Sequence, residues 1–195
     1  DKIIYFKGQE KIVADNNVKF KDNQKKIFVV SKKITYLKKV KQMYTEGETE
    51  AIINSKYKFV SKDVVFNEKN MKLYSYKKTI ITDDNHSQYE LGSFNYHIKN
   101  EFLKGTNISI IQNTITEIGK SDRLFFKSGF FDLKSKNFKS AYTEINLKKS
   151  FFNNNENDPR LYGASSYRKN NITTIEKAVF TSCKKTDKCP PWRIE

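Results

Sequence analysis

Glycine, proline and cysteine are scarce in this chain, and long apolar runs are missing. Its 195 residues include 7 glycines, 3 prolines and 2 cysteines, which excludes a collagen-like repeat and a low-complexity chain. No apolar run is long enough to cross a bilayer as a helix. The chain begins at Asp1 without a methionine and stops at Glu195 without a polar tail, so we expect a mature fragment of a longer protein.

Aromatic and β-branched residues are abundant. The sequence holds 15 phenylalanines and 11 tyrosines, and with many isoleucines and valines these favour strands over helices. The hydrophobic fraction is 37% and the mean hydropathy is −0.74, which is polar for a domain with a packed core. Strands that bury only one face need no higher apolar content. The composition therefore predicts one large all-β domain with half-buried strands.

The formal net charge is +15 and the sequence pI is about 9.6. Such a balance favours a polyanionic partner, and nucleic acid, a membrane surface and a phosphorylated glycolipid all qualify. Lysine could equally be the default exposed residue of a lysine-rich proteome. Charge alone therefore selects no function.

One pattern occurs four times along the chain: apolar-x-apolar-x-Ser-x-x-apolar-x-apolar. Apolar residues alternate up to the serine, and the phase then slips by one residue before alternation resumes. A slip of one residue turns side chains to the other face unless a bulge or corner compensates, so each unit is predicted to be a sharply bent strand. The four copies are Ile27, Val29, Ser31, Ile34, Tyr36; Tyr57, Phe59, Ser61, Val64, Phe66; Tyr89, Leu91, Ser93, Tyr96, Ile98; and Leu124, Phe126, Ser128, Phe131, Leu133.

A polar turn and a further apolar segment follow each unit, for example Met71 and Leu73 after the second. The fold predicted from this order is all-β, a stack of bent antiparallel hairpins with few or no helices. Alternating apolar residues in strands most often form an ordinary core. The one-dimensional repeat favours instead an elongated groove between two sheets.

Two stretches carry a resemblance to a known family. The opening Ala14-Asp15-Asn16-Asn17-Val18-Lys19-Phe20 is similar to a strand start in which glycine usually stands at the position of Asn16, and the units around Ser31, Ser61 and Ser128 are similar to the strands that follow it. They resemble the OstA-type domain of the lipopolysaccharide-transport proteins LptA, LptC and LptD.

The end of the chain resembles the segment that joins this domain to the barrel in the LptD members. Three stretches carry this second likeness: Pro159-Arg160-Leu161-Tyr162-Gly163, Ala178-Val179-Phe180-Thr181-Ser182-Cys183 and Pro190-Pro191-Trp192-Arg193-Ile194. Phe180 stands where tyrosine is usual. The resemblance implies a periplasmic OstA-like domain over residues 1–180 and a cysteine-containing segment over residues 181–195 that leads to a C-terminal β-barrel beyond this chain.

The resemblance also implies a site and a function. The fold would be an elongated folded jellyroll, or β-taco, whose apolar interior carries the acyl chains of lipopolysaccharide across the periplasm to the outer-membrane barrel. The residues expected to line this groove are Val18, Phe20, Ile27, Val29, Ile34, Tyr36, Tyr57, Phe59, Val64, Phe66, Met71, Leu73, Tyr89, Leu91, Tyr96, Ile98, Leu124, Phe126, Phe131 and Leu133.

The expected partners follow from the same resemblance. They are lipopolysaccharide, an LptA-like bridge protein that pairs with an exposed strand edge at Val18 to Lys21, and an LptE-like lipoprotein that joins the full-length barrel. The expected location is the periplasmic face of the outer membrane of a Gram-negative bacterium. We expect no cofactor, no metal and no nucleic-acid partner.

The two cysteines, Cys183 and Cys189, lie close together in the sequence. A lone close pair is typical of a metal site, a redox pair or a disulfide. No histidine lies nearby to complete a zinc site, so a disulfide in an oxidising compartment is the simpler interpretation. The resemblance marks Cys183 as a disulfide former, and its partner is either Cys189 or a cysteine of the barrel.

Sequence motifs for catalysis are missing, and we expect no enzyme. The chain lacks a G-x-S-x-G motif, and His86 and His97 stand apart from other metal ligands. Asp83-Asp84-Asn85 is best explained as a turn, and Glu46, Glu48 and Glu50 as a solvated strand face.

Three alternatives stay open. The first is a soluble LptA-like bridge, against which the cysteine-containing end argues. The second is a basic nucleic-acid-binding β module, for which aromatics and lysines should share an exposed face; their alternation along strands predicts opposite faces. The third is a β-solenoid enzyme that acts on polysaccharide, which would need carboxylates in the groove.

Overall fold

The chain folds almost entirely into β-strands. The structure, a computed structural model, describes residues 2–112, 121–149, 157–184, 186 and 194. Within that part of the chain there is no α-helix and no helix long and apolar enough to span a membrane, and a 3-10 turn, η1 (Lys7–Gln9), follows β1. The strands are β1 (Lys2–Phe6), β2 (Lys11–Asp22), β3 (Ile27–Leu37), β4 (Gln42–Ile53), β5 (Tyr57–Lys62), β6 (Val65–Asn67), β7 (Lys72–Ser75), β8 (Thr79–Thr82), β9 (Gln88–Leu91), β10 (Ser93–His97), β11 (Phe102–Ile111), β12 (Arg123–Asp132), β13 (Asn137–Asn146), β14 (Arg160–Lys169), β15 (Ile172–Glu176) and β16 (Val179–Thr181).

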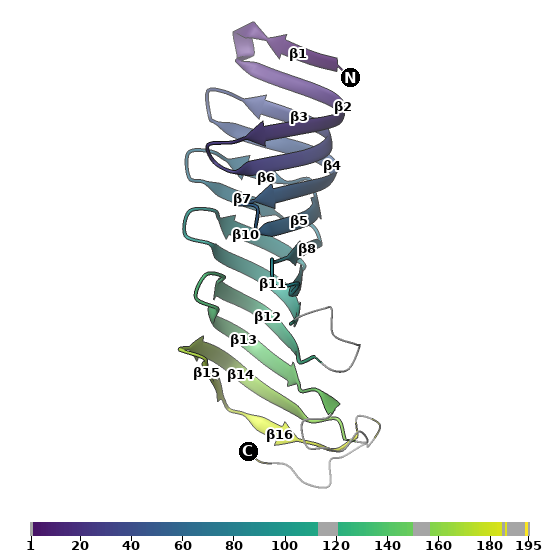
Figure 1. The fold of residues 1–195 in the computed structure, drawn as a ribbon, viewed down its shortest axis with the longest axis vertical. Helices are drawn as coiled ribbons and strands as arrows, with labels where there is room; N and C mark the ends of the chain where they lie inside the picture. Colours follow the sequence, from purple (N-terminus) through teal and green to yellow (C-terminus); the bar gives the residue numbers. More distant parts are fainter. Residues whose placement is uncertain (1, 113–120, 150–156, 185, 187–193, 195) are drawn as a thin grey trace.

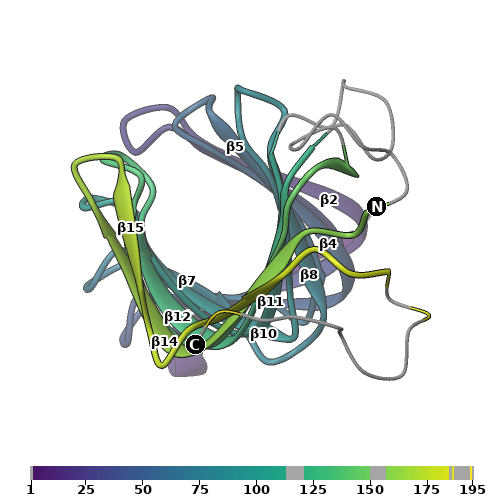
Figure 2. The ribbon, with the colours of Figure 1, turned by 90° about the horizontal axis from the view of Figure 1, so that it is seen from below.

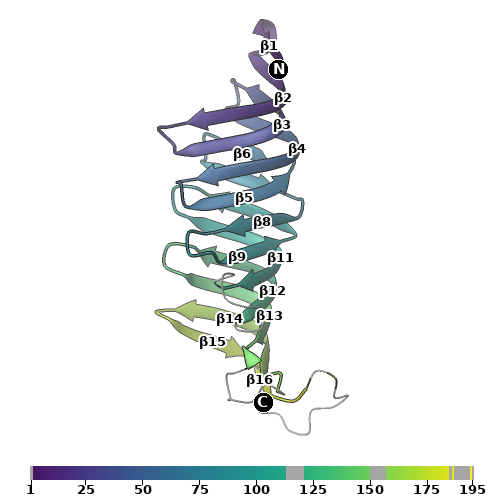
Figure 3. The same cartoon turned by 45° about the vertical axis from the view of Figure 1, so that its right-hand side comes forward.

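These strands join into one antiparallel sheet that is stacked along the long axis of the molecule (Figures 1 and 3). The main path runs β1-β2-β3-β4-β5-β8-β9-β11-β12-β13-β14-β15, so strands close in sequence are mostly neighbours in space. The predicted all-β fold of stacked, bent antiparallel hairpins, elongated and jellyroll-like, is confirmed.

The sheet is folded lengthwise into two walls that face each other, which is visible along the long axis in Figure 2. Each long strand crosses from one wall to the other, whereas β5, β8 and β9 belong to one wall and β6, β7 and β10 to the other. The first wall comprises β5, β8, β9 and β16 with residues 18–22, 27–31, 49–53, 108–111, 123–126, 143–146 and 160–163. The second wall comprises β1, β6, β7, β10 and β15 with residues 11–15, 33–37, 42–44, 102–105, 129–132, 137–140 and 165–169.

The crease between the walls coincides with the predicted phase slip. In β3, residues 27, 29 and 31 are buried, and burial resumes at Ile34 after a register shift between Ser31 and Lys33. In β2 the corresponding shift lies between Asp15 and Val18, where Asn16 and Asn17 have φ angles of 68° and 52°. Glycine and asparagine tolerate this left-handed conformation best. Asn16 can therefore take the place of the glycine that is usual in the similar strand start.

Small hydroxyl side chains line the crease and bond to one another. Ser31 Oγ lies 3.1 Å from Thr49 Oγ1, Ser61 Oγ lies 2.8 Å from Thr79 Oγ1, and Ser93 Oγ lies 2.7 Å from Thr106 Oγ1. A bent strand leaves room only for small inward side chains, and a buried hydroxyl needs a hydrogen-bond partner. Ser31 and Ser61, at the first two predicted corners, therefore bond to a buried threonine of a neighbouring strand, whereas the Ser93–Thr106 pair at the third corner is exposed.

Near the fourth corner, two neighbouring strands carry glycine where the other corners carry small hydroxyl side chains. Gly105 of β11 pairs in register with Gly129 of β12, directly after Ser128. A Cβ on Gly105 would lie 2.3 Å from Leu91 Cδ2, and one on Gly129 would lie 2.6 Å from the Phe131 ring. The absence of side chains thus lets the interior residues close over the corner.

The two ends of the stack differ. At the N-terminal end, β1 pairs only with residues 11–15 of β2, so residues 18–22 form the edge of the first wall within the described residues. The predicted strand edge at Val18 to Lys21 is therefore confirmed. At the other end, β16 runs to Thr181, one residue past the predicted domain boundary, and Arg160 Nη1 donates to the Cys183 carbonyl oxygen.

Candidate functional site: an apolar interior and its mouth

The space between the two walls is filled by one continuous cluster of apolar side chains. All twenty predicted groove residues lie in this cluster or pack against it: seventeen are buried, and Val18, Phe20 and Tyr36 are partly buried at its margin. Sequence analysis therefore identified interior positions correctly. Whether lipid contacts them stays a prediction.

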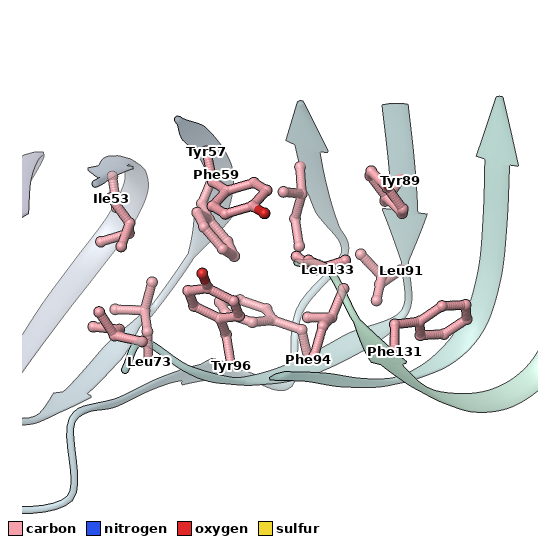
Figure 4. Close-up of a cluster of buried hydrophobic side chains, with 14 of the residues drawn as sticks. Ile53, Tyr57, Phe59, Leu73, Tyr89, Leu91, Phe94, Tyr96, Phe131 and Leu133 are labelled. Carbon is pink, nitrogen blue, oxygen red and sulfur yellow. The ribbon is translucent and has the colours of Figure 1, made fainter. Parts of the chain in front are cut away.

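Aromatic rings from opposite walls meet in the middle of the interior. The centroid of Phe59 on β5 lies 5.4 Å from that of Phe94 and 5.1 Å from that of Tyr96, both on β10. These strands are not neighbours in the sheet, so the contacts cross the interior, as Figure 4 shows. Phe126 of the first wall meets Phe138 of the second at 5.3 Å in the same way.

The middle of the interior is packed rather than hollow. Tyr57, Leu73 and Tyr96 have a relative exposure of 0%, and their side chains point towards one another from the two walls (Figure 4). A chain of methylene groups could occupy this region only by displacing side chains or by parting the walls. The interior is thus a closed core over much of its length.

Sequence analysis missed ten further members of the cluster. Most of them lie on the return strands, whose alternation, as in Ala51 and Ile53, was a usable signal. Phe94 was missed because the repeated unit was anchored on Ser93 and took Tyr96, three residues later, as the next apolar position. The residues are Met43, Ala51, Ile53, Ile81, Phe94, Leu103, Ile108, Ile110, Phe138 and Ile145.

The free side of the two walls, opposite the crease, is a mouth formed by turns. Turns 23–26, 54–56 and 83–87 belong to the first wall, and turns 68–71, 98–101 and 133–136 to the second. Three ion pairs cross this mouth from one wall to the other, and we call them the mouth pairs. They are Lys25 Nζ to Glu68 Oε1 at 2.9 Å, Lys56 Nζ to Glu101 Oε2 at 3.2 Å, and Lys136 Nζ to Asp83 Oδ2 at 2.9 Å.

In each mouth pair, the carboxylate also accepts a hydrogen bond from the hydroxyl of a tyrosine of the interior. Tyr36 Oη donates to Glu68 at 2.9 Å, Tyr57 Oη to Glu101 at 2.8 Å and Tyr89 Oη to Asp83 at 3.3 Å. Burial raises the pKa of all three hydroxyls, and the neighbouring carboxylates raise it further. The hydroxyls therefore stay protonated and act as donors.

The carboxylates of two mouth pairs have perturbed pKa values. Hydrogen bonds from Lys25 and Tyr36 lower the pKa of Glu68. The side chain of Asp83 is fully buried, and burial alone would raise its pKa. The hydrogen bond and charge of Lys136, with the backbone amides of Ser87 and Asn85, outweigh burial, so the pKa of Asp83 lies below its usual value.

At the C-terminal end the interior opens into a cleft of about 570 Å³. Its apolar floor continues the buried cluster through Leu124, Ile145 and Leu161. Arg168 stands at its rim, where Nη2 donates to Asn171 Oδ1 at 3.2 Å and Nε is buried without a hydrogen-bond partner. A smaller cavity of about 50 Å³, lined by both Arg168 and Lys136, connects this rim with the last mouth pair.

The predicted separation of aromatics and lysines fails at a row on the outer face of β12, β13 and β14. Phe130, Lys139 and Tyr167 are direct neighbours on adjacent strands, and the two aromatics are 46% and 41% exposed. They line an open groove of about 400 Å³. The prediction of opposite faces is wrong at this row, because the phase slip after Ser128 places Phe130 outside and Phe131 inside.

The outer face of β4 is a solvated charge ladder. Glu46, Glu48 and Glu50 pair with Lys33, Lys62 and Lys58 of neighbouring strands at 2.7, 2.7 and 2.8 Å, which confirms the solvated-strand interpretation. Asp83-Asp84-Asn85 is a turn, as predicted, because Asp83 accepts from the amides of Asn85 and Ser87.

In the described part of the chain, no three His, Cys, Asp or Glu side chains lie close enough to hold a metal ion. Cys183 is buried with a free thiol. Cys189 and Trp192 lie outside the described residues, so the disulfide stays a prediction. Compared with models of known protein families and with curated proteins, the sequence matches none.

Proposed function

We propose that this chain is an OstA-like lipid-binding domain that holds the acyl chains of lipopolysaccharide between its two walls and passes them across the periplasm towards the outer membrane. The observation that carries the proposal is the single apolar cluster that runs along the folded sheet and opens into a cleft at the C-terminal end. Such an interior offers many similar contacts and no specific polar site, which suits a sliding hydrocarbon chain.

The energetics favour an apolar ligand in this cleft. Each methylene group removed from water contributes about 0.8 kcal/mol, and the floor of the cleft offers leucine and isoleucine side chains at Leu124, Ile145, Leu147, Leu161 and Ile175. The cation at its rim, Arg168, is suited to a phosphate of the headgroup. A phosphorylated glycolipid satisfies both the apolar floor and the basic rim.

The edge of the first wall supports a partner. Residues 18–22 present a strand edge to solvent within the described structure. An LptA-like protein could extend the sheet here by main-chain pairing, and an LptE-like lipoprotein would join only through the barrel. A soluble bridge protein with the same fold is the alternative within this class.

The competing class is a basic nucleic-acid-binding module. One observation favours it: the exposed row of Phe130, Lys139 and Tyr167 combines aromatic faces with a cation, as proteins that stack single-stranded bases do. The buried cluster has no role in such a function, and we therefore place it second.

Native mass spectrometry with lipopolysaccharide separates the two classes. The fragment is titrated with lipopolysaccharide, and a short single-stranded DNA is added as competitor at low and high salt. Lipid bound in stoichiometric amounts and not displaced by DNA supports the proposal. Salt-sensitive DNA binding without lipid binding would overturn it and favour the basic module.

A further inference from the structure

The mouth pairs follow one another in a regular row. Successive turns of the first wall, 23–26, 54–56 and 83–87, meet successive turns of the second wall, 68–71, 98–101 and 133–136. The paired residues are 43, 45 and 53 positions apart in the chain, so each contact joins hairpins that are not neighbours in the sheet. The row closes the mouth over the packed part of the interior.

The closure is coupled to the interior beneath it. The carboxylate of each mouth pair accepts a hydrogen bond from a tyrosine whose ring packs in or against the apolar cluster. Tyr57, which donates to Glu101, also contacts Tyr96 of the opposite wall with ring centroids 5.9 Å apart. A ligand that moves these rings therefore removes a donor from the carboxylate above.

The mouth pairs have the properties of a reversible closure. The lysine side chains are 30% to 40% exposed, and ion pairs in such positions are screened and individually weak. The last pair is the exception, because its carboxylate, Asp83, is fully buried and requires a compensating cation. The last pair therefore parts only where an anion competes for Lys136 while Asp83 keeps its tyrosine and backbone donors.

Among the described residues, the mouth pairs end where the cleft begins. Beyond them, the first wall continues from β11 to β12 and the second wall from β14 to β15. The described residues at these two places, Gln112 and Asp122 on one side and Arg168 and Asn171 on the other, line the cleft of about 570 Å³. Arg168 and Lys136 both line the adjacent small cavity, so two cations flank the boundary between the open and the closed part of the mouth.

We propose that the mouth pairs form a releasable clasp that controls the entry of a phosphate-bearing lipid into the interior. The lipid docks in the open cleft, its phosphate binds Arg168 and draws Lys136 away from Asp83, and the mouth pairs then part in order towards the N-terminal end. This inference rests on the proposed function, since it concerns how the same interior is loaded.

A reversible crosslink across the mouth tests the clasp. Lys56→Cys and Glu101→Cys are combined in a background with Cys183→Ser and Cys189→Ser, and a short, reducible thiol crosslinker joins the two turns. The matched control carries Glu48→Cys and Lys62→Cys, direct partners within the first wall. The crosslink across the mouth should slow lipopolysaccharide uptake at least about tenfold because the walls can no longer part, and reduction should restore the rate. Equal uptake by the crosslinked and reduced forms would overturn the clasp.

A charge swap gives the converse test. Lys56→Met should speed uptake, whereas Lys56→Glu combined with Glu101→Lys restores an ion pair and should return the rate towards that of the unaltered protein. Hydrogen exchange of the amides in turns 54–56 and 98–101 follows mouth opening without lipid, and Lys56→Met should raise it. Unchanged exchange and unchanged uptake in Lys56→Met would show that the pair does not hold the mouth.

The role of phosphate is tested with lipid A and its dephosphorylated form. The bisphosphorylated lipid should enter faster, and Arg168→Gln should remove most of this difference. Equal rates for both lipids would exclude phosphate exchange at Lys136. If the unaltered protein binds neither lipid, the proposed function itself fails, whereas lipid uptake that ignores the crosslink overturns only the clasp.

Discussion

The hydroxyl of Tyr57 donates to Oε2 of Glu101 at 2.8 Å, although the two residues belong to opposite walls of the folded sheet. Tyr57 begins β5 in the first wall, and Glu101 ends the turn before β11 in the second. The Tyr57 ring is buried, whereas Glu101 also pairs with Lys56 at the mouth. One hydrogen bond thus ties the apolar interior to the polar closure above it.

Tyr57→Phe should destabilise the fold. The change removes the donor to Glu101 and keeps the ring, so the expected loss is about 1.5–3 kcal/mol of unfolding free energy, as for a hydrogen bond to a charged acceptor. Urea denaturation followed by tyrosine fluorescence or circular dichroism measures this loss. An unchanged midpoint would show that Glu101 is satisfied by Lys56 alone.

Tyr96→Phe should stabilise the fold, in contrast to Tyr57→Phe. The Tyr96 hydroxyl is buried without a hydrogen-bond partner, and an unsatisfied buried hydroxyl costs about 1–3 kcal/mol. Its removal should therefore raise the denaturation midpoint, in contrast to the same change at Tyr57. A clear loss of stability in Tyr96→Phe would mean that its hydroxyl has a partner that this structure does not contain.

The sequence predicts the walls better than the mouth, for a physical reason. Alternation records which face of a strand is buried, and a phase slip records a corner, so Ser31, Ser61 and the interior positions follow directly from the pattern. A mouth pair such as Lys25 with Glu68 joins turns that are 43 positions apart. The pairing depends on how far the walls are offset and twisted, which no local pattern encodes.

Phe59→Ala should be among the most damaging single changes. Phe59 is 1% exposed and contacts Phe94 and Tyr96 of the opposite wall, so truncation leaves a cavity at the place where the walls meet. The expected loss is about 3–5 kcal/mol, measured as a fall in thermal midpoint. Phe130→Ala is the control, because Phe130 lies on the outer face and should cost about 1 kcal/mol or less.

Photo-crosslinking tests which face meets lipid. A photoreactive residue at Phe59 or Phe126, both in the interior, should trap lipopolysaccharide during loading. The same residue at Lys58 or Lys127, which are exposed on the outer face, should not. Comparable adducts from both faces on a denaturing gel would contradict the proposal of an interior conduit.

Stability should fall in acid as Asp83 is protonated. Its pKa is lowered in the folded protein, whereas an unfolded aspartate titrates near about 3.9. A carboxyl group with a depressed folded pKa contributes stability that is complete above the unfolded pKa and is lost as the pH falls through the folded pKa. Unfolding free energies measured by urea titration should therefore decline below about pH 4, and Asp83→Asn should show a flatter decline.

Lys136→Met tests whether Lys136 keeps the pKa of Asp83 low and so sets this acid dependence. Without the cation, burial becomes the dominant influence on Asp83 and raises its pKa, so the loss of stability should begin at a higher pH than in the unaltered protein. The variant should also be less stable near neutral pH, because it leaves a buried carboxylate with only its tyrosine and backbone donors. An acid profile identical to that of the unaltered protein would show that Lys136 does not hold the charge of Asp83, and the last mouth pair would then be unable to act as a clasp.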